Sequence, residues 1–249
     1  QKEPTRGDFT DRYMFTADYT YPSSEKLYDW ELGYTYTAPR LSLGVNLYYM
    51  KYKDQLVPTG MVNDDSNALN TNVPDSYRRG VELSASWRAT GWFTVGANAT
   101  FSQNRIENYV DALKDSPTYG KELGDMTIAY SPDVIANAFL NFHHRGFEAV
   151  FHTQHVGKQY FTNNENDALS LDAYCVTNLN LAYTFRTRSA RSVRLGLLIN
   201  NLFNAEYESN GYGYSYMDTW SGPAPVRIDE AYYFPQAPLN VLANVTVKF

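Results

Sequence analysis

LSLGVNLYY (residues 41–49) places a large apolar residue at every second position, with small or polar residues between them. Successive side chains of a β-strand point to opposite faces, so this alternation predicts a strand with one apolar face. Helical periodicity is convincing nowhere in the 249 residues. The chain is therefore predicted to be all-β.

The same two-residue period returns along the whole chain. We predict about nine strands, at residues 30–37, 41–49, 81–87, 93–101, 134–142, 147–158, 179–185, 193–199 and 241–249. The apolar positions of this pattern, which are expected to share one face of the sheet, include Leu43, Val45, Leu83, Val95, Leu140, Leu181, Leu197 and Val245. The other face carries mainly Ser, Asn, Thr and Gly.

The connections between these strands alternate between short and long. Short links with Pro, Gly or charged residues occur at 38–40, 89–91, 144–146 and 187–192, whereas long ones span 57–77, 107–132, 159–171 and 204–232. Short turns at one end and long loops at the other are typical of an outer-membrane β-barrel. The alternative is a soluble antiparallel barrel or sandwich whose apolar face points inward.

Aromatic residues and charge support the membrane interpretation. The chain is 16% aromatic with 22 Tyr, and rings at strand ends suit the aromatic girdles of a membrane barrel. Those rings are Trp30, Tyr49, Trp87, Trp92, Phe93, Phe101 and Phe203. The net charge of −6, with no basic stripe, argues against nucleic-acid binding. No run approaches the roughly 18 apolar residues of a membrane-spanning helix.

Four stretches resemble the C-terminal part of TonB-dependent outer-membrane receptors of the ferric-chelate type. They are VNLYYMKYKDQLV (45–57), TNVPDSYRRGVELSASW (71–87), NNLFNAEYESNGY (200–212) and the terminal VTVKF (245–249). The resemblance covers essentially the whole chain, and its most specific piece is the NNLFN element followed by one last strand that ends in Phe249. Residues 1–249 are accordingly expected to be the C-terminal portion of such a barrel.

The resemblance implies a 22-stranded antiparallel transmembrane barrel of the Gram-negative outer membrane, with an N-terminal plug. It implies import of a scarce chelate, a ferric siderophore or similar iron complex, or else haem or cobalamin. Partners would be outer-membrane lipid, the rest of the barrel and plug, the TonB-type coupler of the inner membrane and the chelate, and a surface lipoprotein is a further candidate. An odd count of about nine strands cannot close an antiparallel barrel, so the chain is expected to be one portion of a larger one.

The last long loop is the main candidate for ligand contact. The first candidates are Tyr207, Tyr212, Tyr214, Tyr216, Trp220 and Arg227, and Tyr232 and Tyr233 offer further rings. The rings are suited to stacking and Arg227 to an anion contact, although rings in such a loop also serve simply to pack it. Asn210-Gly211 is expected to form a tight turn. Family members end in a similar strand, and the resemblance implies that Phe249 is read as the barrel-assembly signal.

No catalytic or metal-binding constellation is evident. The acidic residues Asp64, Asp65, Asp111, Asp115, Glu122 and Asp125 are expected to be solvated loop carboxylates rather than a cation site. None of the four His residues lies in a long loop, where haem iron would be captured. We therefore expect no catalytic residue, metal or cofactor. A passive porin and a barrel-embedded hydrolase remain the alternatives from other functional classes.

Overall fold

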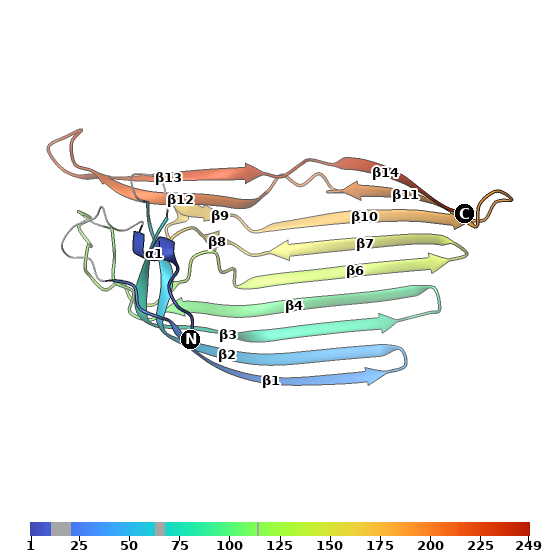
Figure 1. Ribbon diagram of the computed structural model, residues 1–249, viewed down its shortest axis with the longest axis horizontal. Helices are drawn as coiled ribbons and strands as arrows, with labels where there is room; N and C mark the ends of the chain where they lie inside the picture. Colours follow the sequence, from blue (N-terminus) through green and yellow to red (C-terminus); the bar gives the residue numbers. More distant parts are fainter. Residues whose placement is uncertain (11–20, 63–67, 114) are drawn as a thin grey trace.

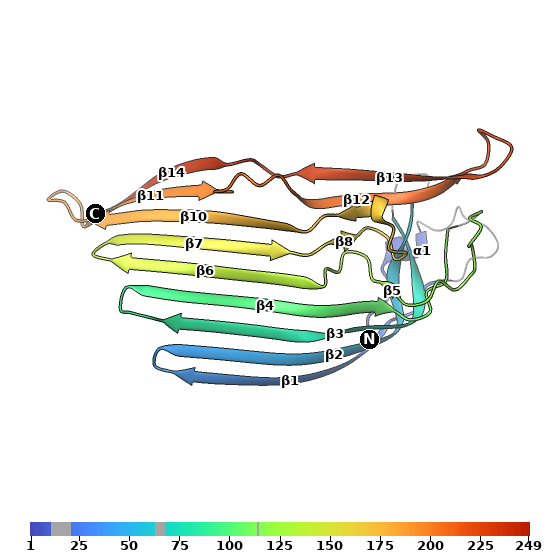
Figure 2. The same cartoon turned by 180° about the vertical axis from the view of Figure 1, so that it is seen from behind.

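One antiparallel sheet organises the molecule (Figures 1 and 2). The computed structural model describes residues 1–10, 21–62, 68–113 and 115–249. Within them, nine strands are hydrogen-bonded in chain order: β1 (Lys26–Ala38), β2 (Leu41–Val62), β3 (Ala68–Arg88), β4 (Phe93–Ile106), β6 (Val134–His144), β7 (Phe147–Val156), β10 (Tyr174–Phe185), β11 (Ser192–Asn200) and β14 (Asn240–Lys248). The path ends at β1 and β14 without closing in this part of the chain. The predicted all-β fold and its nine strands are confirmed.

Smaller elements occupy one end of the sheet, which we call the loop end. They are α1 (Arg6–Thr10), β5 (Met126–Thr127), β8 (Gln159–Tyr160), the 3-10 helix η1 (Asp167–Leu169), β9 (Ser170–Leu171), and the hairpin of β12 (Glu208–Asp218) and β13 (Val226–Pro235). The opposite end, the turn end, carries only short connections. Of the described helices, none is long and apolar enough to cross a membrane.

Apolar side chains cover one face of the sheet and remain exposed there. The register pairs Val45 with Leu83 and Leu83 with Ala99, so the apolar rows run continuously across neighbouring strands. Val45 is 37% exposed, Leu83 44% and Val245 65%, and none of the eight residues predicted for this face is buried. We call it the apolar face. Exposed apolar rows on every strand are what a sheet facing lipid requires.

The opposite face, the polar face, is built from hydrogen-bonded polar side chains. Asn46 Nδ2 donates to Glu82 Oε2 at 3.2 Å and to Glu31 Oε2 at 3.5 Å. Further along the sheet, the Arg194 guanidinium makes two hydrogen bonds to Glu148, at 2.9 and 2.7 Å. Carboxylates on this face need water or partners, so the two faces require different surroundings.

The turn end follows the predicted short links. Between β6 and β7, only Arg145 and Gly146 connect the strands, with φ values of 48° and 84°. Two residues with positive φ form a type I′ turn, whose twist matches that of the paired strands. A Cβ at Gly146 would lie 2.3 Å from the Thr184 carbonyl oxygen, so this position needs glycine for space as well as conformation.

Two of the four expected long loops are instead largely strand. Most of 57–77 continues β2 and β3, which pair as far as Val62 and Ala68. The last loop contains the β12–β13 hairpin, and the tight turn expected at Asn210-Gly211 is wrong. Asn210 pairs with Phe234 and Gly211 with Tyr233 inside that hairpin. By contrast, 107–132 is mostly irregular in the described residues, with only β5 and an isolated bridge between Val110 and Glu122.

Buried apolar clusters lie at the loop end rather than within the sheet. One contains Val57, Val73, Ile106, Tyr109 and Ile128, and joins the β2–β3 extension to the 107–132 loop. Burial, with the nearby Asp111 carboxylate, raises the pKa of Tyr109 to about 12, so this phenol stays neutral. These contacts give the loops a fixed arrangement above the sheet.

Candidate ligand-binding site at the loop end

The β12–β13 hairpin has two different faces because its side chains alternate. Tyr212 pairs with Tyr232, and Tyr214 pairs with Glu230, so these four side chains share one face. Gly211, Ser215 and Met217 are buried on the other. The hairpin extends past β11 and β14 at the loop end (Figure 1). It therefore presents one covered and one open surface.

The covered face packs on the 159–171 loop. Phe161 is 1% exposed and Leu169 is fully buried, and both lie against the glycines of β12. A Cβ at Gly211 would lie 2.8 Å from Phe161 Cζ, and one at Gly213 would lie 2.9 Å from Leu169 Cδ2. Contacts this close leave room only for glycine, so the two glycines let the strand approach the loop.

The open face, which we call the tyrosine face, consists of Tyr212, Tyr214, Tyr216, Tyr232 and Phe234 around Glu230. The hydroxyls of Tyr214 and Tyr232 donate to Glu230 Oε2 at 2.7 and 2.8 Å, and that of Tyr216 donates to Oε1 at 3.2 Å. Tyr212 and Tyr232 stack with their centroids 4.9 Å apart. The hydrogen bond from Tyr214, followed by that from Tyr232, lowers the pKa of Glu230. The carboxylate is therefore ionised at neutral pH.

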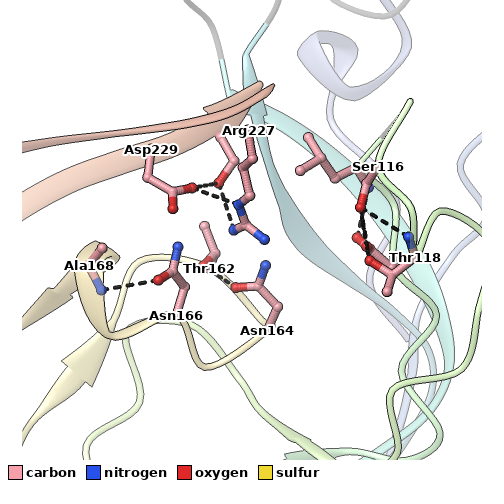
Figure 3. Close-up of polar contacts among 11 residues, drawn as sticks. Ser116, Thr118, Thr162, Asn164, Asn166, Ala168, Arg227 and Asp229 are labelled. Atoms are coloured by element: carbon pink, nitrogen blue, oxygen red, sulfur yellow. Dashed lines mark hydrogen bonds and ion pairs between the residues drawn. The ribbon is translucent and has the colours of Figure 1, made fainter. Parts of the chain in front are cut away.

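Polar side chains gather beside the covered face (Figure 3). Arg227 Nε donates to Asp229 Oδ1 at 2.8 Å, and the same guanidinium donates to Ser215 Oγ at 3.0 Å. Burial would raise the pKa of Asp229, but hydrogen bonds from Ser215 and Arg227 outweigh it and lower the pKa. Figure 3 shows the guanidinium directed toward the side chains of Asn164 and Asn166. This polar cluster joins the hairpin to the 159–171 loop.

The Asp111 carboxylate supports its own loop. It accepts hydrogen bonds from Thr118 Oγ1 at 2.5 Å, from the Leu113 amide at 3.0 Å and from Ser116 Oγ at 3.3 Å. Asp111 is 4% exposed, so its expected solvation is wrong, because the loop folds its own donors around the carboxylate. The pair Asp64-Asp65 lies outside the residues that the structure describes. Among the described residues, no group of three His, Cys, Asp or Glu side chains is arranged to hold a metal ion.

Comparison with known proteins places the fold in a family. The family model described as "TonB dependent receptor-like, beta-barrel" matches residues 4–202. The chain belongs to this family. TonB-dependent receptors are transport proteins of the Gram-negative outer membrane, not enzymes. The apolar face is thus the lipid-facing side of a barrel portion, and the polar face is the luminal side.

Solved receptor structures share this TonB-dependent receptor fold. The ferric yersiniabactin uptake receptor FyuA from Yersinia pestis is 20% identical, with a TM-score of 0.63 over 91% of this chain and 30% of that one. The ferric-catecholate import receptor Fiu from E. coli is 18% identical, with a TM-score of 0.60 over 92% of this chain and 28% of that one. The copper transporter OprC is 19% identical, with a TM-score of 0.61 over 92% and 32%. The chain spans about a third of the length of these proteins.

Within this receptor barrel, the six predicted ligand-binding residues do not form one cluster. Tyr212, Tyr214 and Tyr216 share the tyrosine face, whereas Arg227 lies on the covered side, paired with Asp229. Trp220 lies at the hairpin tip and is 79% exposed. Tyr207 precedes the hairpin and stacks on Tyr174 with a centroid distance of 4.7 Å.

Sequence reasoning missed Glu230 as the residue that organises the receptor's tyrosine face. It also missed Thr162, Asn164 and Asn166, whose side chains lie near Arg227 in Figure 3. The spacing of Tyr212, Tyr214 and Tyr216 is itself a strand pattern. That spacing could have indicated a strand with one tyrosine-bearing face. Only the register of the hairpin, however, places Glu230 opposite Tyr214.

Proposed function

We propose that residues 1–249 are the C-terminal portion of a 22-stranded, plugged receptor that imports a ferric siderophore or a similar iron complex. Import would draw energy from a TonB-type coupler acting on the plug. The observation that carries this proposal is the convergence of the β2–β3 extension, the 159–171 loop and the β12–β13 hairpin above the luminal face, where β12 contacts both β2 and η1. Loops held together by buried clusters are suited to recognise a ligand before it enters the lumen.

Ligand contact is assigned to the hairpin. The tyrosine face offers rings for stacking, Trp220 extends them at the tip, and the Arg227 cluster offers polar contacts on the other side. Tyr207 is assigned to the base of the same site. The long loops contain no His in their sequence, which favours an iron chelate over haem as the ligand.

Replacing Tyr212, Tyr214 and Tyr216 together by alanine should lower affinity for the imported chelate at least about tenfold, because each aromatic contact contributes about 0.5–1.5 kcal/mol. The full receptor would be titrated with a ferric trihydroxamate, a ferric tris-catecholate, haem and cobalamin. Replacing Tyr28, Tyr34 and Tyr36 of β1 by alanine is the matched control, since it removes three exposed rings from the apolar face and leaves the hairpin intact. Unchanged affinity in the triple variant would remove the hairpin from the ligand site, and tight binding of haem or cobalamin would change the ligand class.

Dependence on energy separates this receptor from a passive porin. Uptake of the chelate by cells should stop when the inner-membrane coupler is deleted, while binding to the cell surface continues. Uptake that persists without the coupler would favour passive diffusion.

We also propose that the terminal strand both closes the barrel and directs its assembly. β14 pairs with β11 along its full length, and Phe249 follows it with 93% of its surface exposed. The remaining edge of β14 would pair with the first strand of the complete barrel, because backbone groups left unpaired in hydrocarbon are costly.

Phe249→Asp should sharply lower the amount of receptor that reaches its folded form in the outer membrane, with synthesis unchanged. The measurement is heat-modifiable mobility of the full receptor in isolated outer membranes. Phe203→Asp is the matched control, since Phe203 is also a highly exposed ring at the end of a strand. Equal losses in the two variants would make Phe249 an ordinary girdle residue.

A further inference from the structure

The connections at the loop end carry an excess of negative charge. The four long connections, residues 57–77, 107–132, 159–171 and 204–232, contain fifteen Asp and Glu residues but only three Lys and Arg residues. Four of these carboxylates, Asp75, Glu107, Glu165 and Asp167, pair with Lys51, Lys53, Arg105 and Lys158 beside the connections, so a smaller negative excess remains. Such a surplus attracts cations and repels anions over distances longer than any single contact. A ligand with a positive charge is therefore concentrated at this surface, and an anionic one is opposed.

The cation within the hairpin does not offset this field. Arg227 is the only basic residue of 204–232, and its guanidinium is held by the Asp229 carboxylate and by Ser215. The luminal face is also negatively charged near Asn46, whose side-chain amide donates to both Glu31 and Glu82. On the same face Arg78 donates to the neutral side chains of Asn104 and Ser131, so one cation lies among these carboxylates without outweighing them.

The tyrosine face combines a carboxylate with exposed rings. Tyr212 is 46% exposed, Tyr232 44% and Phe234 50%. Among the residues that the structure describes, Glu230 has phenol partners but no ion pair. An ionised carboxylate accepts hydrogen bonds at about four sites. The three phenols therefore leave an acceptor position of Glu230 free. The negative faces of tyrosine rings also attract cations.

Building on the proposed function, we propose that the imported chelate is cationic, with its ammonium group bound on the tyrosine face beside Glu230. The ammonium would donate to the free acceptor position of the carboxylate and to phenol oxygens, while neighbouring rings contact its methylene groups. The charge surplus of the loops selects the sign of the ligand, and the tyrosine face supplies the specific contact.

Two matched pairs of probes test this inference on the full receptor. One pair is a ferric trihydroxamate with a free terminal amine and its N-acetylated form, and the other is a ferric tris-catecholate with the same two end groups. The amine form should bind about five- to tenfold more tightly than its acetylated partner in at least one pair, the range expected for one cation–π contact together with one exposed ion pair. Titration at low and high salt should show the preference shrinking as salt screens it.

Glu230→Gln should abolish the preference for the amine while retaining affinity for the acetylated chelate, because the glutamine oxygen still accepts from Tyr214 and Tyr232. Asp115→Asn is the matched control: it removes the same charge from an exposed position with φ of 64°, a conformation that Asn tolerates. Equal binding within each pair, or a preference that survives Glu230→Gln, overturns the inference and leaves the import proposal intact. Failure of all four chelates to bind overturns the import of these iron complexes itself.

Discussion

Val45→Arg should lower the free energy of unfolding of the receptor barrel by about 2–4 kcal/mol, whereas Asn46→Arg should have little effect. Val45 lies on the apolar face, 37% exposed and paired with Tyr34 and Leu83. An arginine there would place its charge in hydrocarbon, where neither water nor a carboxylate compensates it. The large expected difference between adjacent positions comes from the two-residue period of the strand.

Asn46 is a suitable control because its surroundings can accommodate a cation. Its amide donates to Glu31 and Glu82 on the luminal face, and an arginine at this position would meet both carboxylates. The measurement is urea-induced unfolding of the full receptor in lipid vesicles, followed by tryptophan fluorescence. Equal losses for the two variants would contradict the assignment of the apolar face to lipid.

Phe161→Ala should release the β12–β13 hairpin from the loops, at a cost of about 3–5 kcal/mol in local stability. Phe161 is 1% exposed and lies against both Gly211 and Gly213, with Tyr130 and Tyr233 on its other sides. Glycines contribute no side chain that can fill the cavity, so the site collapses poorly after the truncation. Hydrogen exchange of the hairpin amides measures the effect directly.

The matched control for this prediction is Trp220→Ala, at the exposed tip of the same hairpin. It removes a larger ring but no buried contact, so exchange in β12 and β13 should be unchanged. The membrane-embedded strands should keep their protection in both variants. Unchanged hairpin exchange in Phe161→Ala would show that the hairpin is held mainly by other contacts, such as those of Arg227.

Sequence alternation predicted the nine strands because each face of the sheet meets one kind of environment. Leu43, Val45 and Leu47 alternate cleanly against Gly44 and Asn46 for this reason. Outside the part of each strand that lies between lipid and lumen, the alternation disappears although the strand continues. In β2, Lys51 and Lys53 share a face with Tyr49, and Val57 is buried at 2% under the loops. Where the surroundings of the two faces change along a strand, the alternation is lost, and the sequence is then mistaken for that of a loop.

The candidate residues of the proposed site came from composition, whereas their arrangement came from the structure. Tyr212, Tyr214 and Tyr216 were identified from composition, and their shared face follows from their spacing. The separation of Arg227 from them, and the position of Glu230 among them, depend on the register of the hairpin. Register arises from contacts such as those of Phe161, which lies more than forty residues away in the chain, so local sequence does not contain it.

The irregular register at the base of the hairpin has a consequence for how the receptor can vary. Glu208 pairs with Pro235 but Asn210 pairs with Phe234, so Ser209 is an extra residue on β12. Above this bulge, the parity of each position determines whether its side chain meets the extracellular medium or the packed loops. A change that moved this parity by one residue would turn the tyrosines of β12 toward Phe161 and the glycines outward. Substitutions on the open face, by contrast, leave the packing of the hairpin on the loops unchanged.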